Sequence, residues 1–283
     1  MLKLVGFFVV VGSVLGGYVL SHGHLLALWQ PYELLILGGA AAGAFLISNP
    51  MTVVKDTMAA CGRNLKGKHY GKEMYMDLLS LLYEIFNKAR KNGLMAIEED
   101  VETPESSEIF NRFPRVTMEG HLMDFICDYL RIMSAGNLSA IELESLMDQE
   151  IETALHEAMA SSHALGKVAD GLPGFGIVAA VMGIVITMAS LGGPPEVLGE
   201  HVAAALVGTF LGILLAYGFV GPLSVALEHM ASEDIKALAC IKTAILAMVN
   251  GIPPQLAVEF GRKTIGSHER PTFKELDDHL RGR

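Results

Sequence analysis

Hydroxyl groups are the polar side chains that two long apolar runs of this sequence carry in their interior. The runs cover about residues 172–191 and 201–221, and neither contains Asp, Glu, Lys or Arg. A lone threonine in a membrane helix most often bonds the carbonyl group one turn earlier, so Thr209 is first interpreted as structural. If the chain conducts ions, the titrating carboxyl group must come from another chain. The hydroxyls belong to Thr187, Ser190, Thr209 and Tyr217.

The motifs of known enzyme classes do not accompany these hydroxyls. The sequence has no GxGxxG motif after a strand, no Walker A motif and no GxSxG motif. Its ten histidines form no HExxH motif or paired i, i+4 site, and Cys61, Cys127 and Cys240 are far apart. We therefore expect no enzyme, no metal and no cofactor, and three free thiols.

Each of the two runs is long enough to cross a membrane. About 20 residues at about 1.5 Å per residue span about 30 Å, the thickness of a bilayer core. The two runs therefore predict a transmembrane hairpin. Two further apolar runs, 4–21 and 33–50, are interpreted as retained membrane helices. A signal peptide is disfavoured because no clear cleavage site follows the first run and the second begins a dozen residues later.

The distribution of Lys and Arg predicts the orientation. Loops 22–32 and 192–200 contain none, whereas segment 51–171 contains twelve and segment 223–283 contains eight. Positive residues favour the cytoplasmic side, so four spans with both termini in the cytoplasm are predicted. The net charge of −10 argues against a nucleic-acid partner.

The fold class is therefore an all-α membrane protein in four parts. Residues 1–50 form transmembrane helices 1 and 2, 51–170 a large cytoplasmic helical domain, 171–222 transmembrane helices 3 and 4, and 223–283 cytoplasmic C-terminal helices and a tail.

Within the cytoplasmic parts, apolar residues at helical spacing predict helices. An acidic loop at 98–114 is interpreted as a solvated face, and the last dozen residues as frayed. The expected helices cover residues 74–90, 119–134, 141–165, 228–251 and 254–263.

Small residues and prolines punctuate the predicted membrane helices. Gly12 and Gly16, like Gly39 and Gly43, lie four apart and are interpreted as helix-packing faces. Pro173 fits the first turn of span three, and Pro222 can stop span four. Alternatively, the two prolines form a hinge between the membrane and the cytoplasmic domain, and the residues alone do not decide.

Three stretches taken together resemble the MotA family, the larger stator subunits of the bacterial flagellar motor. They are Leu172 to Ala180 (LPGFGIVAA), Val207 to Phe219 (VGTFLGILLAYGF) and Gly221-Pro222-Leu223. The resemblance implies a pentamer in the bacterial inner membrane around two copies of MotB. A MotB aspartate then carries protons through the complex, and the pentamer turns the rotor through FliG.

The resemblance also implies roles for individual residues. Arg90 and Glu98 match the family's rotor-contact residues, and Pro173 and Pro222 match its two functional prolines. Thr209 matches the channel-facing threonine, expected near the aspartate of MotB. Ala180 and Gly208 stand where sodium-type relatives carry hydroxyls, which favours protons, although Thr187 and Ser190 add hydroxyls nearer the outer end.

Two other functions stay open at this point. An ExbB/TolQ-like energiser of envelope transport also surrounds a partner that carries an aspartate, but such proteins usually have three spans. A non-conducting membrane scaffold would use the cytoplasmic helices only to dock partners. Four spans, a short first outer loop and the match at Arg90 and Glu98 favour the MotA family.

Overall fold

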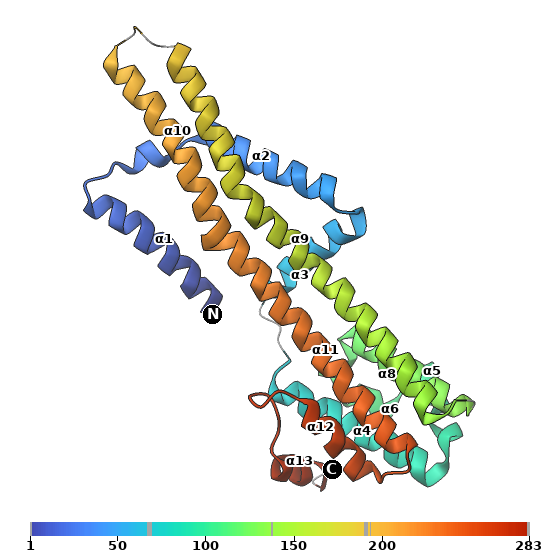
Figure 1. The fold of residues 1–283 in the computed structure, drawn as a ribbon. Helices are drawn as coiled ribbons and strands as arrows, with labels where there is room; N and C mark the ends of the chain where they lie inside the picture. The colour runs from blue at the N-terminus through green and yellow to red at the C-terminus, as the bar shows by residue number, and fades with distance from the viewer. Residues whose placement is uncertain (1, 67–69, 137, 190–191, 193, 282–283) are drawn as a thin grey trace. The chain divides into compact units, whose positions relative to one another are not determined.

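The computed structural model describes residues 2–66, 70–136, 138–189, 192 and 194–281, and within these ranges it contains helices and no β-strand. The chain divides into two compact units (Figure 1). We call Met1–Lys68 with Glu157–His229 the membrane unit, and His69–His156 with Met230–Arg283 the helical unit. The expected all-α fold is confirmed.

The membrane unit contains four helical stretches that are long and apolar enough to cross a membrane, as predicted. Two of them, in α9 and from α10 onward, extend into residues of the helical unit. The elements are α1 (Leu2–Leu20), η1 (Leu25–Leu28), α2 (Pro31–Ser48), α3 (Met51–Lys66), α9 (Ala140–Ala189), α10 (Pro195–Leu215), the π-helical η3 (Ala216–Val220) and α11 (Gly221–Val249).

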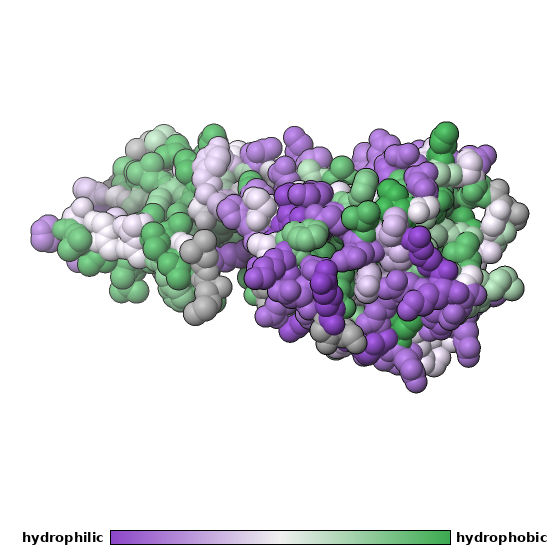
Figure 2. All heavy atoms as spheres, turned by 90° about the horizontal axis from the view of Figure 1, so that it is seen from below, coloured by the Kyte–Doolittle hydropathy of each residue, from purple (hydrophilic) through white to green (hydrophobic). Residues whose placement is uncertain are grey.

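Large apolar side chains on these helices are exposed in the single chain. Phe8 on α1 is 69% exposed and Ile47 on α2 is 88% exposed. On the face drawn in Figure 2, hydrophobic residues gather in one region and hydrophilic residues predominate in another. An apolar helix exposed in this way requires lipid or a partner chain to cover it.

Both prolines lie within continuous helical runs, which contradicts one of the two interpretations left open, that they mark helix ends. Pro173 lies inside α9, and Pro222 is the second residue of α11. In the π-helical segment that precedes Pro222, the Gly221 N–H donates to the carbonyl of Ala216, five residues back. This shift of the hydrogen-bond ladder comes just where Pro222 lacks an N–H, so the helix continues with little further loss.

The glycine pairs of the first two spans contact no other helix among the described residues of this chain, so their role in helix packing stays a prediction. A Cβ atom built at Gly12, Gly16, Gly39 or Gly43 would meet nothing within 4 Å among the described residues.

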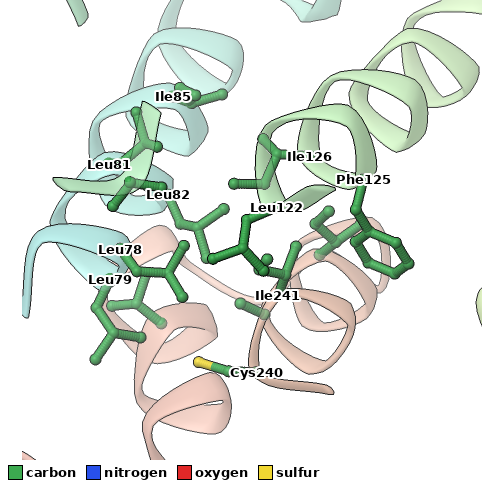
Figure 3. Close-up of a cluster of buried hydrophobic side chains, with 14 of the residues drawn as sticks. Leu78, Leu79, Leu81, Leu82, Ile85, Leu122, Phe125, Ile126, Cys240 and Ile241 are labelled. Atoms are coloured by element: carbon green, nitrogen blue, oxygen red, sulfur yellow. The ribbon is translucent and has the colours of Figure 1, made fainter. Parts of the chain in front are cut away.

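The helical unit is built around an apolar core in which α4 (Lys72–Asn92), α8 (Gly120–Ala135) and α11 meet (Figure 3). Leu82 of α4, Leu122 of α8 and Ile241 of α11 are fully buried. Apolar residues three and four apart along α4 form one face that fills this core, as the spacing predicts. The remaining elements are η2 (Leu94–Ile97), α5 (Glu98–Glu102), α6 (Glu108–Asn111), α7 (Pro114–Thr117), α12 (Pro254–Thr264) and α13 (Phe273–Arg281).

Two segments of the helical unit are more ordered than predicted. The acidic loop 98–114 forms the short helices α5, α6 and the start of α7. The end of the chain, expected to fray, forms α13, whose Leu276 and Leu280 are buried. Thr272 and Glu275 exchange hydrogen bonds as a capping box at its start, which explains why this polar segment is helical.

Candidate functional site

Helices α9 and α10 approach closely because small residues line their contact. A Cβ atom at Gly212 would lie 2.7 Å from the carbonyl oxygen of Leu172, and one at Gly176 would lie 3.0 Å from that of Gly208. One at Gly183 would lie 2.7 Å from the Cβ of Ala205. These distances leave no room for a side chain, so backbone contacts backbone along the hairpin.

This close approach determines the hydrogen bond of Thr209. Its hydroxyl donates to the carbonyl of Gly176 on α9 at 3.4 Å, rather than to the carbonyl one turn earlier in α10. The predicted bond within the same helix is therefore wrong. The reason is that glycine at position 176 allows the carbonyl of the neighbouring helix to come within reach. Thr209 is half-buried, so part of the residue stays open.

The other hydroxyls of the hairpin differ from Thr209. Thr187 is 1% exposed, and its hydroxyl donates to the carbonyl of Gly183 at 2.8 Å, the usual structural bond. Tyr217 is 72% exposed, and Ser190 lies outside the described residues. Among the described residues of the hairpin, Thr209 is therefore the threonine whose hydroxyl group forms a hydrogen bond between the two helices.

The residues predicted beside Thr209 lie along the same pair of helices. Ala180, half-buried, comes one turn after Gly176 on α9. Pro173 is also half-buried and follows Leu172, which is buried together with Ala41 of α2 and Ala216 of η3. Pro222 is exposed.

Sequence reasoning missed Glu33. This residue is in the first turn of α2 and is 8% exposed, and its Oε2 atom has no hydrogen-bond partner among the described residues. A Cβ atom at Gly208, the neighbour of Thr209, would lie 2.6 Å from that oxygen. This chain therefore places a buried carboxyl group of its own beside the hairpin, and the expectation that another chain supplies the ion-carrying carboxyl stays a prediction.

A signal for Glu33 was present in the sequence. The apolar stretch Leu25–Ser48 that can cross a membrane contains an acid, and such residues are functional by default. Our interpretation placed Glu33 at the boundary of the second run and looked for acids only in the hairpin.

In the helical unit, Arg90 and Glu98 are both exposed, as predicted. Arg90 lies in the last turn of α4, and Glu98 is the first residue of α5. Gly93, with φ of +86°, ends α4 and turns the chain into η2, which leads directly to Glu98. Only a short connection therefore separates the two opposite charges along the chain.

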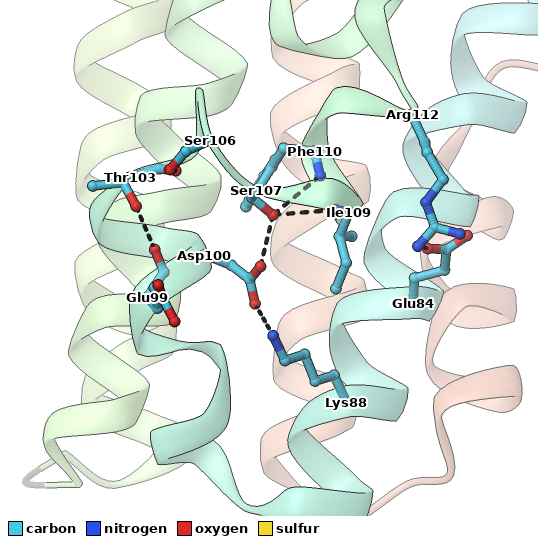
Figure 4. A network of polar contacts seen from close by, with 10 residues as sticks. All are labelled: Glu84, Lys88, Glu99, Asp100, Thr103, Ser106, Ser107, Ile109, Phe110 and Arg112. Carbon is cyan, nitrogen blue, oxygen red and sulfur yellow. Dashed lines mark hydrogen bonds and ion pairs between the residues drawn. The ribbon is translucent and has the colours of Figure 1, made fainter.

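A buried carboxylate fixes this connection (Figure 4). Asp100 of α5 forms an ion pair with Lys88 of α4 at 2.6 Å. It also accepts a 2.7 Å hydrogen bond from the hydroxyl of Ser107. Asp100 is 8% exposed, so the interpretation of the whole acidic stretch as a solvated face is wrong at this residue. Glu102 also pairs with Arg131 of α8 at 2.6 Å. These contacts hold α5, and with it Glu98, against α4 and α8.

Among the described residues, no three or more His, Cys, Asp or Glu side chains lie close enough together to hold a metal ion. Cys61, Cys127 and Cys240 are free. Burial raises the pKa of the Cys127 thiol to about 11 and that of the Cys240 thiol to about 12. Thiols of this kind are inert at neutral pH, so these two are core residues rather than reactive groups.

Comparison with known proteins gives a consistent picture. Residues 4–93 match the family described as Motility protein A N-terminal, and residues 117–239 match the MotA/TolQ/ExbB proton channel family. Motility protein A of Salmonella typhimurium is 50% identical over 99% of this chain and 95% of its own length. Motility protein A of Escherichia coli is 47% identical over the same shares, and the chemotaxis protein LafT of Vibrio parahaemolyticus is 41% identical over 99% of this chain and 98% of its own.

Solved structures support the fold. The C. jejuni MotAB structure matches with a TM-score of 0.79 at 20% identity, covering 95% of this chain and 97% of the matched chain. The flagellar MotAB stator complex from Bacillus subtilis matches with a TM-score of 0.71 at 22% identity, covering 90% and 92%.

Proposed function

The chain belongs to the Motility protein A family, and on that basis we propose that it is a stator subunit of the bacterial flagellar motor. With a MotB partner it forms a proton-conducting complex that converts the proton motive force into torque on the rotor. The match of residues 4–93 to the Motility protein A N-terminal family favours this function over an ExbB/TolQ-like energiser.

The observation that carries the proposal is the contact between α9 and α10 at Thr209. Two membrane helices packed backbone to backbone form a wall without Asp, Glu, Lys or Arg in its apolar spans. A half-buried hydroxyl on that wall can exchange its bond to Gly176 for one to a carboxyl group on an incoming helix. In this proposal Thr209 and Ala180 face the MotB helix and its aspartate.

Protons are the proposed ion because the positions of added hydroxyls in sodium-type relatives carry Ala180 and Gly208 here. The hydroxyl of Thr187, which left the choice open, is bonded within its own helix. At fixed pH, swimming speed should then be independent of the sodium concentration.

Pro173 and Pro222 are proposed to couple ion transfer to movement. Each lacks the N–H that would continue the α-helical ladder, and Pro222 directly follows a π-helical segment. Bending of a helix localises where its hydrogen bonds are missing or shifted. Both residues therefore fit a hinge that transmits a change at Thr209 along α9 and α11.

The rotor contact is proposed at Arg90 and Glu98. Two exposed, opposite charges held by the network around Asp100 present a fixed pattern to a complementary surface, here FliG. Such complementarity steers encounters and selects the partner while adding modest affinity, which suits contacts that form and break repeatedly.

The arrangement in the cell follows from the distribution of charge. We propose an inner-membrane protein with both termini in the cytoplasm, and the absence of Lys and Arg from loops 22–32 and 192–200 supports this orientation. Parts 1–50 and 171–222 then lie in the membrane, and 51–170 and 223–283 in the cytoplasm. Exposed apolar side chains on α1 and α2 fit lipid and neighbouring subunits of a pentamer.

Complementation of motility tests partner and function together. A strain that lacks its own copy should build flagella but not swim, and this chain should restore swimming only together with a MotB-like partner. Lost siderophore uptake or a weakened envelope would point to the ExbB/TolQ function instead. If the deleted strain swims normally and keeps its envelope functions, the non-conducting membrane scaffold is the remaining function.

A further inference from the structure

Glu33 is a buried carboxyl group in a membrane helix that no hydrogen bond in the described structure explains. It is 8% exposed, and its Oε2 atom is shielded from solvent without a partner among the described residues. Buried polar atoms in folded proteins nearly always have a partner, so an exception calls for a functional explanation. Ionisable residues inside membrane segments commonly mark a path for ions or protons.

The position of Glu33 connects the outer solution to the proposed ion path. Glu33 is the third residue of α2, so the outer loop that precedes α2 is less than one turn away. Its carboxyl group points to Gly208 of α10, where a Cβ atom would lie 2.6 Å from Oε2. Thr209, the proposed partner of the MotB aspartate, is the next residue of α10.

Few other groups near Glu33 can titrate. Helix α10, which packs on α2, carries Glu196, Glu200 and His201 as its ionisable side chains. Glu196 and Glu200 are exposed at its outer end. His201 lies two turns before Gly208 and so on the same face, and its buried Nδ1 atom also has no partner among the described residues. The apolar part of α9, residues 171–189, carries no ionisable side chain.

We propose that Glu33 is a proton-transfer group at the outer entrance of the ion path, one step before the partner's aspartate. This proposal rests on the proposed stator function. A hydronium ion from the outer phase gives its proton to a carboxylate oxygen of Glu33 and leaves water. The new O–H bond then breaks as the proton passes to the partner's carboxylate, directly or through water, and Glu33 becomes a carboxylate again.

Glycine at position 208 is part of this arrangement. A Cβ atom there would displace the flexible carboxyl group of Glu33 from its present position, and it would also lie 3.0 Å from the Cβ of Ala179. Because Gly208 has no side chain, the carboxyl group of Glu33 has space to lie directly against α10. A purely structural carboxyl would be expected to bond a neighbour instead of occupying this place unpaired.

The test compares Glu33→Gln with the unchanged chain in membrane vesicles that contain the MotB-like partner. Glutamine keeps the size and polarity of the side chain but cannot carry the proton. We expect proton influx to fall by about tenfold, less than the about hundredfold effect of a group at the reacting atoms, because water can partly bypass an entrance group. The amount of chain in the membrane and the capture of the partner should not change.

Glu196→Gln is the matched control because it makes the same chemical change at an exposed acid of α10. It should leave the influx unchanged. Glu33→Asp keeps a carboxyl group on a shorter side chain, so it should retain more influx than Glu33→Gln and alter the dependence of influx on external pH. The aspartate variant also decides the question if the glutamine variant does not accumulate.

The outcomes separate this proposal from the function on which it rests. Influx through Glu33→Gln equal to that of the unchanged chain would overturn the role of Glu33 and leave the stator function intact. An unchanged rate and pH dependence in Glu33→Asp would do the same. No influx through the unchanged chain with its partner would count against the stator function itself.

Discussion

Glycine at position 212 determines how closely α9 and α10 can approach. Its missing side chain leaves space for the Leu172 carbonyl, which lies 2.7 Å from where a Cβ would be. That carbonyl belongs to backbone, so it cannot move aside as the end of a flexible side chain can. The bond from Thr209 to Gly176 depends on the same close approach.

We therefore expect Gly212→Ala to separate α9 from α10 and to reduce both swimming and the thermal stability of the purified chain. A helical glycine replaced by alanine would otherwise gain up to about 1 kcal/mol from helix propensity. Gly199→Ala, also in α10, meets nothing within 4 Å among the described residues and is the matched control. Equal melting temperatures and equal swimming for the two variants would show that the close contact is unimportant.

The residues of the candidate site were predictable to different degrees. Thr209, Arg90 and Glu98 were found through the resemblance, because their types alone are common in any chain. The bond of Thr209 was mispredicted since its acceptor lies on a different helix, and distance along the sequence does not reveal it. Glu33 was missed because acids were sought only in the hairpin, and its contact with Gly208, 175 residues later, cannot be read from the sequence.

Among the elements, α4 and α8 were predicted from apolar periodicity because each buries one face. Of the two interpretations of Pro173 and Pro222 that the sequence left open, the one in which they end helices was wrong. Pro173 inside α9 loses one hydrogen bond, but packing of the membrane helix continues on both sides of it. The polar composition of the last dozen residues also led to the wrong prediction that they fray. The capping box and two buried leucines stabilise α13 instead.

The cap of α13 gives a prediction for stability. Thr272→Ala removes the hydroxyl that accepts the N–H of Glu275, which should cost about 1 kcal/mol of local stability. Hydrogen exchange of residues 273–281 should become faster. Thr153→Ala, an exposed helical threonine bonded only to the carbonyl of Gln149, should leave exchange at α13 unchanged. Equal exchange in the two variants would contradict the role of the cap.

The same cap should depend on pH. The Nζ of Lys72, 2.6 Å away, and the N–H and hydroxyl of Thr272 lower the pKa of Glu275 from 4.5 to about 2. A carboxyl whose pKa is lowered by folding contributes stability above its unfolded pKa and loses it as pH falls through the folded value. Exchange at α13 should therefore rise as pH falls from 4.5 toward 2 in the unchanged chain, after correction for intrinsic rates, and less so in Glu275→Gln.

In the whole molecule, we propose that the helical unit contacts the rotor and the membrane unit forms part of the ion path. In the helical unit, Arg90→Glu and Glu98→Lys each reverse one exposed charge without touching the core. We expect each reversal to lower the torque of tethered cells while the protein stays in the membrane. Lys274→Glu and Glu152→Lys reverse exposed charges on α13 and α9 and serve as controls. Normal swimming of the double reversal would remove Arg90 and Glu98 from the rotor contact.

In the membrane unit, a proton that reaches Glu33 meets no further carboxyl group along the apolar stretch of α9 or along α10 and η3 beyond Gly208. Beyond Gly208, the rest of α10 and η3 carry no Asp, Glu, Lys, Arg or His, and neither does the apolar part of α9. Moving a charge through so apolar a region without a carrier is costly. The chain reconstituted alone should therefore leak no protons, although it contains Glu33. Addition of a MotB-like partner with its aspartate should open the path, and the same partner with asparagine there should not. A robust leak through the chain alone, measured as acidification of vesicles under a membrane potential, would show that this chain holds a complete path of its own.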